Sequence, residues 1–349
     1  MLEKKISLGR DKDGKLIRKS VRGKTKAEIE KKTFQVRQEW MEQSNNKPTN
    51  DITLVSFARH WLKTEKQHAA INTKAMYENV IEKHLAAELS DLYFSEITQS
   101  DLQNIINLNF EKYETCNKIK LTLRQLYEAA RDNEIETHKS VNIKKLLMPK
   151  KEKNEKRALT KEEIAALTEA KLTDKQKAFV NLLYYSGIRR EEALALDYKA
   201  VDLKNKTLKI NQALVFDKNA PRIERTKNIY SNRVIHIPTA LCAVLSDYGR
   251  GKKGLMFTMN NGEPMTQSSF TKFWMGIQKS LSEVTPSAQE LTPHIFRHNY
   301  ATMLYYSDIS IKEAARIMGH SNTQMIMQIY AHLDAEKENT AEKIEKVFA

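Results

Sequence analysis

Two histidines and an arginine, His294, Arg297 and His298, stand together in one otherwise largely apolar stretch of the sequence, HIFRHNYATML. Thr292 and Pro293 come just before it, and both residue types are favoured at the beginning of a helix. The spacing of three and four residues places the basic side chains on one face of that helix, within its first two turns. Because a helix N-terminus offers free N–H donors and a positive dipole end, this face is suited to bind an anion.

A zinc site is the first alternative for this cluster. Zinc helices of the H-E-x-x-H type also space two histidines four residues apart. Here Ile295 follows His294 where that motif needs a glutamate, and Arg297 would repel a metal cation. We therefore expect no metal and no other cofactor. The second alternative is a histidine buried for structural reasons, and it stays open for His298.

Two further segments supply side chains that could complete a phosphate site. In SGIRREEALAL, Arg189 follows a glycine turn at the start of a helix, and we expect only one of Arg189 and its neighbour Arg190 to face inward. In IMGHSNTQMIMQIYAH, His320 follows a glycine and Tyr330 comes ten residues later. Two arginines can hold one phosphate through paired hydrogen bonds. A tyrosine, whose unperturbed pKa is about 10, becomes a nucleophile when neighbouring cations stabilise its phenolate.

In their order and spacing, these segments resemble the tyrosine recombinase family, specifically the phage-type integrases with an N-terminal arm-binding domain. The matching text is SGIRREEALAL, ERTKNIYSNRVIHIP, LTPHIFRHNYATML and RIMGHSNTQMIMQIYAH, and it covers about residues 155–335. The resemblance implies a multidomain, mainly α chain. Its expected parts are a small N-terminal domain of a β-hairpin sheet plus a helix, a helical core-binding domain, and a mixed α+β catalytic domain of the tyrosine recombinase type.

The resemblance also implies a role for each residue that matches the family's motifs. Two arginines clamp the scissile phosphate, a lysine and two histidines assist, and a tyrosine is the nucleophile; the implied catalytic set is Arg189, Lys227, His294, Arg297, His320 and Tyr330. Glu192 resembles the acidic residue that supports the first arginine, and His298 matches a supporting position.

The lysine assignment rests on the hairpin segment. Ser231 and Arg233 follow Lys227 at the family's spacing, although Arg222 and Arg225 are basic alternatives nearby. The sequence departs from the family pattern at two places that carry no chemistry, Asn228, where threonine is frequent, and Ser307–Asp308, where a glycine is frequent.

The expected reaction is an in-line attack of Tyr330 on a DNA phosphodiester. The arginines stabilise the pentacoordinate phosphorane, and Lys227 protonates the departing 5′-oxygen. The product is a 3′-phosphotyrosine that retains the bond energy, so neither ATP nor a metal is needed. A 5′-hydroxyl from a partner duplex then attacks this ester, and the chain integrates and excises a mobile element, a prophage or a conjugative element.

The charge of the chain agrees with a nucleic-acid partner. Lys and Arg number 58 against 44 Asp and Glu, a net charge of +14. Residues 1–50 hold 14 basic and 7 acidic residues, which is half of the excess. An excess of this size indicates a polyanionic ligand. The two cysteines, Cys116 and Cys242, are far apart and form no disulfide framework, as in proteins of a reducing bacterial cytoplasm; we expect association with the nucleoid there.

Local signals outline the elements that must position the site. Two segments of strand character flank the turn Asp11–Gly14, and the helix after them begins with a capping box of Thr25 and Glu28. A second capping box, Thr160 with Glu163, begins the helix that opens the third part, and Thr98 is an N-cap within the second. We expect an arm-site domain at 1–45, a linker at 46–51, a helical core-binding domain at 52–148, a linker at 149–158, a catalytic domain at 159–333 and a tail helix at 334–349.

The basic residues of the N-terminal hairpin are the expected DNA contacts, namely Arg10, Lys15, Arg18, Lys19, Arg22 and Lys24. The expected partners are double-stranded DNA at core and arm attachment sites, further copies of the chain in a homotetramer, an excisionase and a host DNA-bending protein. The amphipathic tail packs either on a neighbouring protomer or on its own domain. A type IB topoisomerase and a chromosome-resolution recombinase are the alternative functions, but the separate basic N-terminal unit favours an integrase.

Overall fold

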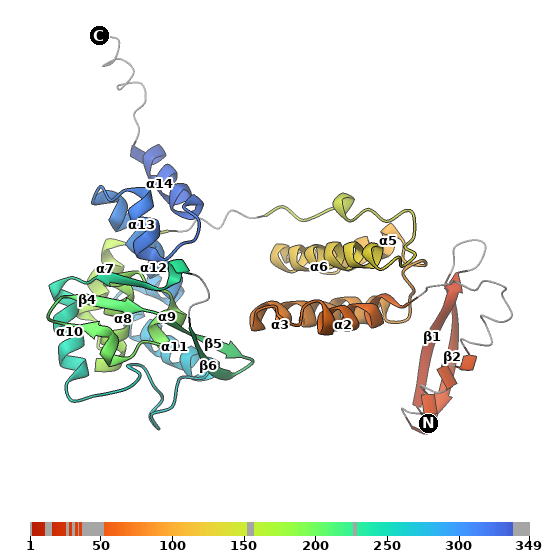
Figure 1. The fold of residues 1–349 in the computed structure, drawn as a ribbon, viewed down its shortest axis with the longest axis horizontal. Helices are drawn as coiled ribbons and strands as arrows, with labels where there is room; N and C mark the ends of the chain where they lie inside the picture. Colours follow the sequence, from red (N-terminus) through yellow and green to blue (C-terminus); the bar gives the residue numbers. More distant parts are fainter. Residues whose placement is uncertain are drawn as a thin grey trace, which may run out of the picture. The chain divides into compact units, whose positions relative to one another are not determined.

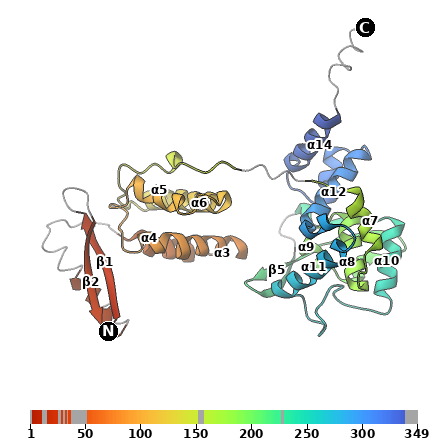
Figure 2. The ribbon, with the colours of Figure 1, turned by 180° about the vertical axis from the view of Figure 1, so that it is seen from behind.

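The computed structural model describes residues 2–10, 16–25, 28–29, 32–33, 35–36, 52–151, 157–225 and 229–337. It divides into two compact units, residues 1–153 and 154–349 (Figures 1 and 2).

The first unit begins with a β-hairpin. Strand β1 (Leu2–Arg10) pairs antiparallel with β2 (Leu16–Gly23), in a register that runs from Leu2 opposite Gly23 to Arg10 opposite Leu16. The expected strands are thus confirmed, while the turn between them lies outside the described residues. Helical residues follow at 28–29, 32–33 and 35–36. Ile6, Val21 and Ile29 form a small core between sheet and helix.

The predicted capping box at this helix is present in a modified form. The N–H of Glu28 donates to Thr25 Oγ1 at 3.2 Å, and the Glu28 carboxylate accepts from the N–H of Lys24 at 2.7 Å. Local hydrogen bonds of this kind satisfy donors that the helix itself leaves open.

The rest of the first unit is helical, with helices α2 and α3 beside α5 and α6 (Figure 1). Its elements are α2 (Leu54–Thr64), α3 (Ile71–Val80), the π-helical turn η1 (Ile81–Leu85), α4 (Ala86–Leu89), α5 (Gln99–Asn107), α6 (Tyr113–Asp132) and the 3₁₀ turn η2 (Ile143–Lys145). Thr98 caps α5 through a full capping box with Asp101, as its sequence predicts. The core includes the edge-to-face ring pairs Phe57–Phe94 and Trp61–Tyr77.

The second unit is a mixed α+β body. Its helices are α7 (Lys161–Glu169), α8 (Asp174–Ser186), α9 (Arg190–Leu194), α10 (Thr239–Gly249), α11 (Gln267–Ser282), α12 (Pro293–Tyr306), α13 (Ile311–Met318) and α14 (Gln324–Lys337), with 3₁₀ turns η3 (Tyr198–Ala200), η4 (Ile229–Ser231) and η5 (Pro286–Glu290). Strands β3 (Val201–Asp202), β4 (Thr207–Ile210) and β7 (Arg233–His236) form one antiparallel sheet, and β5 (Gln212–Asp217) pairs with β6 (Ala220–Arg225).

An aromatic cluster around Phe179 holds this unit together. The Phe179 ring lies edge-on to Phe257 and contacts Trp274, which lies edge-on to Phe296 of α12. Such ring pairs contribute about 0.5–1.5 kcal/mol each beyond their burial. The cluster therefore fixes α8, α11 and α12 against one another, and α12 carries three of the residues singled out by sequence.

Within the described residues, no helix combines the length and the apolar character needed to cross a membrane.

Candidate active site

Residues from three separate segments meet around one open pocket of about 420 Å³. The segments are the start of α9, the start of α12 and the stretch from the turn after α13 to the start of α14. The lining residues are Arg189, Arg190, Glu191, Thr292, Pro293, His294, Arg297, His320 and Met325. Four members of the predicted catalytic set therefore lie together, although they are far apart in the sequence.

Arg189 is positioned by its own helix. Helix α8 ends at Gly187, whose φ of +59° makes the left-handed turn that brings the chain to α9. Arg189 is the N-cap of α9, and its N–H donates to the Glu192 carboxylate at 2.9 Å. The guanidinium donates to Glu192 Oε1 at 2.9 Å and to the Gly319 carbonyl at 3.0 Å.

Gly187 is required by the packing as well as by its backbone. A Cβ at this position would lie 2.3 Å from the Tyr300 ring of α12. The glycine thus allows α8 and α12 to approach closely, which places Arg189 beside Arg297.

Arg297 is a buried cation with only 4% of its surface exposed. It donates to the carbonyls of Gly187 at 2.8 Å and Met318 at 2.6 Å. Burial, and then the nearby charge of Arg189, lowers the pKa of Arg297 to about 9, so the guanidinium stays protonated at neutral pH. Among the described residues no carboxylate forms an ion pair with it. A buried cation whose hydrogen-bond partners are neutral carbonyl groups is poised to bind an anion.

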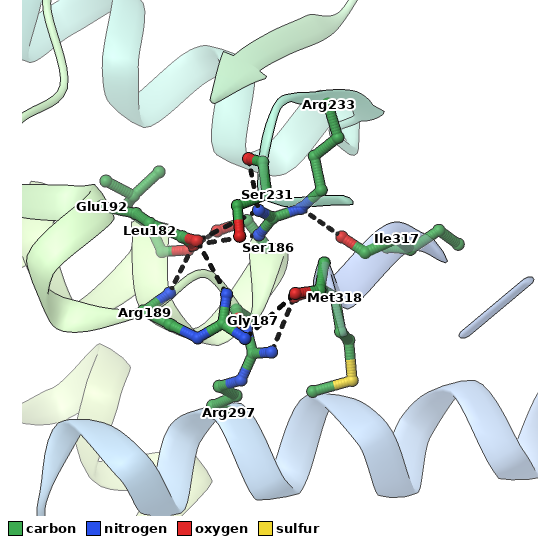
Figure 3. Close-up of polar contacts among 11 residues, drawn as sticks. Leu182, Ser186, Gly187, Arg189, Glu192, Ser231, Arg233, Arg297, Ile317 and Met318 are labelled. Atoms are coloured by element: carbon green, nitrogen blue, oxygen red, sulfur yellow. Dashed lines mark hydrogen bonds and ion pairs between the residues drawn. The ribbon is translucent and has the colours of Figure 1, made fainter. Parts of the chain in front are cut away.

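Glu192 and Arg233 form a buried ion pair, and neither residue lines the pocket (Figure 3). The Arg233 guanidinium donates to both Glu192 oxygens, at 3.1 and 2.9 Å. Burial raises the pKa of Glu192, but the hydrogen bonds and charges of Arg233 and Arg189 lower it by more than burial raises it. The net shift of the pKa is therefore downward. Glu192 therefore stays ionised and holds Arg189 through hydrogen bonds to its N–H and its guanidinium. The sequence suggested the contact with Arg189 but gave no role to Arg233.

His320 follows Gly319, which ends α13 with a φ of +66°. The imidazole is 9% exposed, and its Nδ1 is buried without a hydrogen-bond partner in the described part of the chain. Burial, and then the charges of Arg297 and Arg189, lowers the pKa of His320 to about 4. The ring is consequently neutral at pH 7 and can accept or pass a proton.

The two histidines of α12 occupy different environments. Helix α12 begins at Pro293 after the N-cap Thr292, as predicted. His294, in the first turn, is exposed and lines the pocket. His298 is half-buried and is not a lining residue, and its supporting role stays a prediction.

Arg190 also lines the pocket, so the expectation that only one of the two adjacent arginines faces inward is wrong. Its guanidinium lies 5.8 Å from the centre of the Phe216 ring and 5.3 Å from that of Phe270, and it pairs with Glu191. The aromatic rings of β5 and α11 create this position, and no local pattern reveals them. The pocket therefore holds a third arginine.

Tyr330 lies apart from the pocket in this structure. Its side chain, on α14, is 6% exposed, and its hydroxyl donates to the Ile309 carbonyl at 3.1 Å. The ring packs edge-on against Tyr305, at 5.0 Å between centres. Burial raises its pKa, so the phenol is protonated here. The residue predicted as the nucleophile is thus held away from the residues predicted to activate it.

Two of the other predicted residues lie outside the described residues. They are Lys227, between the end of β6 and η4, and Lys15. Arg10 belongs to β1, although its side chain is not described; Arg18, Lys19, Arg22 and Lys24 are exposed. Arg18 and Arg22 are four residues apart in β2, so both side chains lie on the same face of the hairpin. Arg22 forms an ion pair with Glu3 at 3.2 Å. In the described ranges, no group of three or more histidine, cysteine, aspartate or glutamate residues is arranged to hold a metal ion.

Comparison with known proteins identifies the family. The family model described as "Phage integrase family" matches residues 157–337, more than half of the 349 residues. A second model, "Phage integrase, N-terminal SAM-like domain", matches residues 53–108.

Two relatives are similar over most of their length. A "Tyrosine recombinase XerC-like" protein of Caldanaerobacter subterraneus subsp. tengcongensis is 26% identical, over 98% of this chain and 95% of the relative. The "Integrase" of Staphylococcus phage L54a is 25% identical, over 89% of this chain and 99% of the relative.

Solved structures share the fold. The Tn1549 transposon integrase, in complex with transposon right end DNA, aligns with a TM-score of 0.71 and 22% identity, over 85% of this chain and all of that one. A lambda integrase tetramer bound to a Holliday junction aligns with a TM-score of 0.59 and 19% identity, over 92% and 90% of the two chains. Because the family model matches more than half of the chain and includes every residue that lines the pocket, the chain belongs to the phage integrase family of tyrosine recombinases, enzymes that cleave and rejoin DNA.

Proposed function

We propose that this chain is a site-specific integrase that inserts and excises a mobile element through a 3′-phosphotyrosine intermediate. The observation that carries the proposal is the meeting of Arg189 and Arg297 at one pocket beside two imidazoles. Arg297 is buried and has carbonyl partners only, so a DNA phosphate would supply its missing counter-charge. The names of the relatives, integrases of a phage and of a transposon, support a mobile element as the substrate.

In the proposed reaction the two arginines hold the non-bridging oxygens of the scissile phosphate. Their charges favour the phosphorane over the diester, since negative charge on these oxygens grows toward the transition state. The Tyr330 oxygen bonds to phosphorus as the bond to the 5′-oxygen breaks. Lys227 gives its proton to the 5′-oxygen, and His294 and His320 are the pocket groups that can relay the phenol proton. Attack by a 5′-hydroxyl of another duplex reverses these steps and exchanges strands.

Tyr330 must move for this reaction to occur. In its present place the phenol has a carbonyl partner and a raised pKa, so it cannot act as a nucleophile. Helix α14 begins at Gln324, shortly after His320. Within the described residues, its main packing partners are α12 and α13. We propose that binding of DNA repositions α14 and brings the phenol to the phosphate. A free protein with its nucleophile withdrawn cannot cut DNA at random.

The remaining parts take their proposed roles from this activity. The hairpin at 1–45 would bind arm sites through Arg18, Lys19, Arg22 and Lys24, and the helical part at 52–148 would bind the core site with the catalytic domain at 159–333. The tetramer seen for lambda integrase on a Holliday junction is the model for a homotetramer here. We further propose that an excisionase and a host DNA-bending protein take part, that the protein acts at the bacterial nucleoid, and that the tail contributes to assembly.

The test of the proposed function is trapping on a nicked suicide DNA substrate that carries the attachment core. The chain should become covalently joined to the DNA without metal or nucleotide, and Tyr330→Phe should not. Tyr306→Phe, which alters an exposed tyrosine of α12, serves as the matched control and should be trapped normally. A covalent adduct formed by Tyr330→Phe would sink the assignment of the nucleophile.

The alternative functions differ in their products. A type IB topoisomerase would relax a supercoiled plasmid that lacks any attachment site, whereas an integrase should require two attachment sites and should yield recombinants. A chromosome-resolution recombinase would not depend on the N-terminal hairpin. Recombination that is lost when Arg18 and Arg22 are both changed to glutamine would favour the integrase.

A further inference from the structure

Arg233 is a buried cation that does not line the pocket. It is the first residue of β7, and only 6% of its surface is exposed. Its guanidinium donates to both oxygens of Glu192, to the carbonyl of Ile317 at 2.7 Å and to that of Ser231 at 3.3 Å. Four of its five N–H donors are bonded within the protein, and its burial keeps the side chain away from the surface that DNA would contact.

Arg233 shares the end of α13 with the two pocket arginines as a source of hydrogen-bond acceptors (Figure 3). Three consecutive carbonyls at the end of α13, those of residues 317, 318 and 319, accept hydrogen bonds from Arg233, Arg297 and Arg189 respectively. The negative end of a helix dipole favours cations at this point. The end of α13 therefore orders three arginines from three segments, and His320 is the next residue.

Glu192 also connects two of these three arginines. It accepts from Arg189 and from Arg233, so its carboxylate is held between them. Glu192 with these two arginines has a net charge of +1, and Arg297 adds a second positive charge that faces the pocket. Without Arg233, Glu192 would be left with Arg189 alone, and it could pull that guanidinium away from the phosphate.

Gly319 leaves the space that the Arg233 guanidinium occupies. A Cβ at Gly319 would lie 2.6 Å from Arg233 Nη1, so the guanidinium occupies the space that any other residue would fill. Arg233 thereby fixes the conformation of the turn that carries His320. The strand β7 also begins only a few residues after Lys227, so the same side chain anchors one end of the segment that bears the proposed general acid.

We propose that Arg233 is a positioning residue for the recombinase reaction, which sets Glu192, and through it Arg189, together with the turn of His320. The inference rests on the proposed function. Arg233 acts through these residues and does not touch the substrate, so its loss should slow cleavage without weakening the binding of DNA.

The experiment compares the full-length chain with Arg233→Lys and Arg233→Gln on a nicked suicide substrate at saturating protein. The single-turnover rate of adduct formation, counted per folded molecule, should fall by roughly ten- to a hundredfold, because a displacement of about 1 Å at a reacting group has effects of this size. The Kd for the uncleaved duplex should change by less than about twofold. Arg233→Lys keeps the charge and serves if Arg233→Gln does not fold.

A double-mutant cycle tests whether Arg233 acts through Glu192. The double variant Glu192→Gln, Arg233→Gln should lose less rate than the product of the two single losses, since the contact between the two residues is removed in all three variants. Fully additive losses would overturn the proposal.

The matched control is Arg157→Gln, which breaks another paired arginine–glutamate contact of the same unit, from Arg157 to the buried Glu163 at 2.6 and 2.7 Å. This change should lower the melting temperature and leave the rate per folded molecule unchanged. A wild-type rate in Arg233→Lys, or a loss explained by the unfolded fraction alone, would overturn the positioning role only. If the unaltered chain forms no adduct at all, the proposed function fails and this inference fails with it.

Discussion

At the scale of single residues, the pocket shows how burial sets the chemical state of its groups. Arg297 and His320 are both buried beside other cations, and for both the environment disfavours the charged form. Arginine has so high an intrinsic pKa that it remains a cation, whereas histidine becomes neutral. The same surroundings thus provide a fixed positive charge and a proton acceptor side by side.

The lowered pKa of His320 gives a prediction for stability. The group titrates near 6.5 in the unfolded chain and at about 4 in the folded one, so the unfolded state binds more protons between these values. The free energy of unfolding should be highest above pH 6.5 and should fall by about 1–2 kcal/mol as the pH is lowered to 5. Urea unfolding at pH 7 and pH 5 measures this change.

His320→Gln should remove most of this dependence on pH, and His236→Gln, which changes an exposed histidine of β7, is the control. An unaltered pH dependence in His320→Gln would show that other groups cause it.

The withdrawn tyrosine gives a second prediction at this scale. Tyr330→Phe removes the hydrogen bond to the Ile309 carbonyl and keeps the ring against Tyr305. The free protein should therefore lose about 0.5–1.5 kcal/mol of stability, the usual net contribution of one hydrogen bond. Thermal unfolding without DNA measures the loss. An unchanged or raised melting temperature would contradict a stabilising hydrogen bond between Tyr330 and Ile309.

At the scale of elements, the site depends on how three helix ends are brought together. Helix α8 ends before Arg189, α12 begins before His294, and α13 ends before His320. The capping residues and glycines that produce these ends could be predicted from the sequence, because caps act over three or four residues. The packing of α8 on α12 could not, since it depends on Gly187 facing the Tyr300 ring far along the chain.

This contact predicts an effect of Gly187→Ala. The new methyl group would meet the Tyr300 ring, and alanine disfavours the positive φ, so the two costs together should destabilise the protein by about 2–4 kcal/mol. Gly251→Ala separates the two causes, because Gly251 has a similar φ of +72° with nothing within 4 Å. Its cost should be only the backbone term of about 1–2 kcal/mol. Equal losses in both variants, in chemical denaturation, would reject the steric contact.

At the scale of the whole molecule, the basic hairpin and the catalytic unit should contribute separately to DNA binding. Arg18 and Arg22 are exposed and lie on one face of β2. Changing both to glutamine should weaken binding to arm-site DNA and reduce the slope of log K against log salt by about 2, if each residue contacts one phosphate. Cleavage of a short core substrate by the same variant should keep its rate. A loss of core cleavage equal to the loss of arm binding would contradict the division of labour.

The sequence alone determined the types and the order of the reacting groups: two arginines, two histidines and a tyrosine with the family's spacing, and the local caps that place them near helix ends. It did so because spacing along a helix and capping hydrogen bonds are short-range properties. Only the tertiary structure decided that Arg190 lies over Phe216 and Phe270, that Arg233 meets Glu192 from 41 residues away, and that the hydroxyl of Tyr330 bonds to Ile309 instead of facing the pocket. These positions depend on burial and on contacts between distant segments, and no local pattern of residues encodes them.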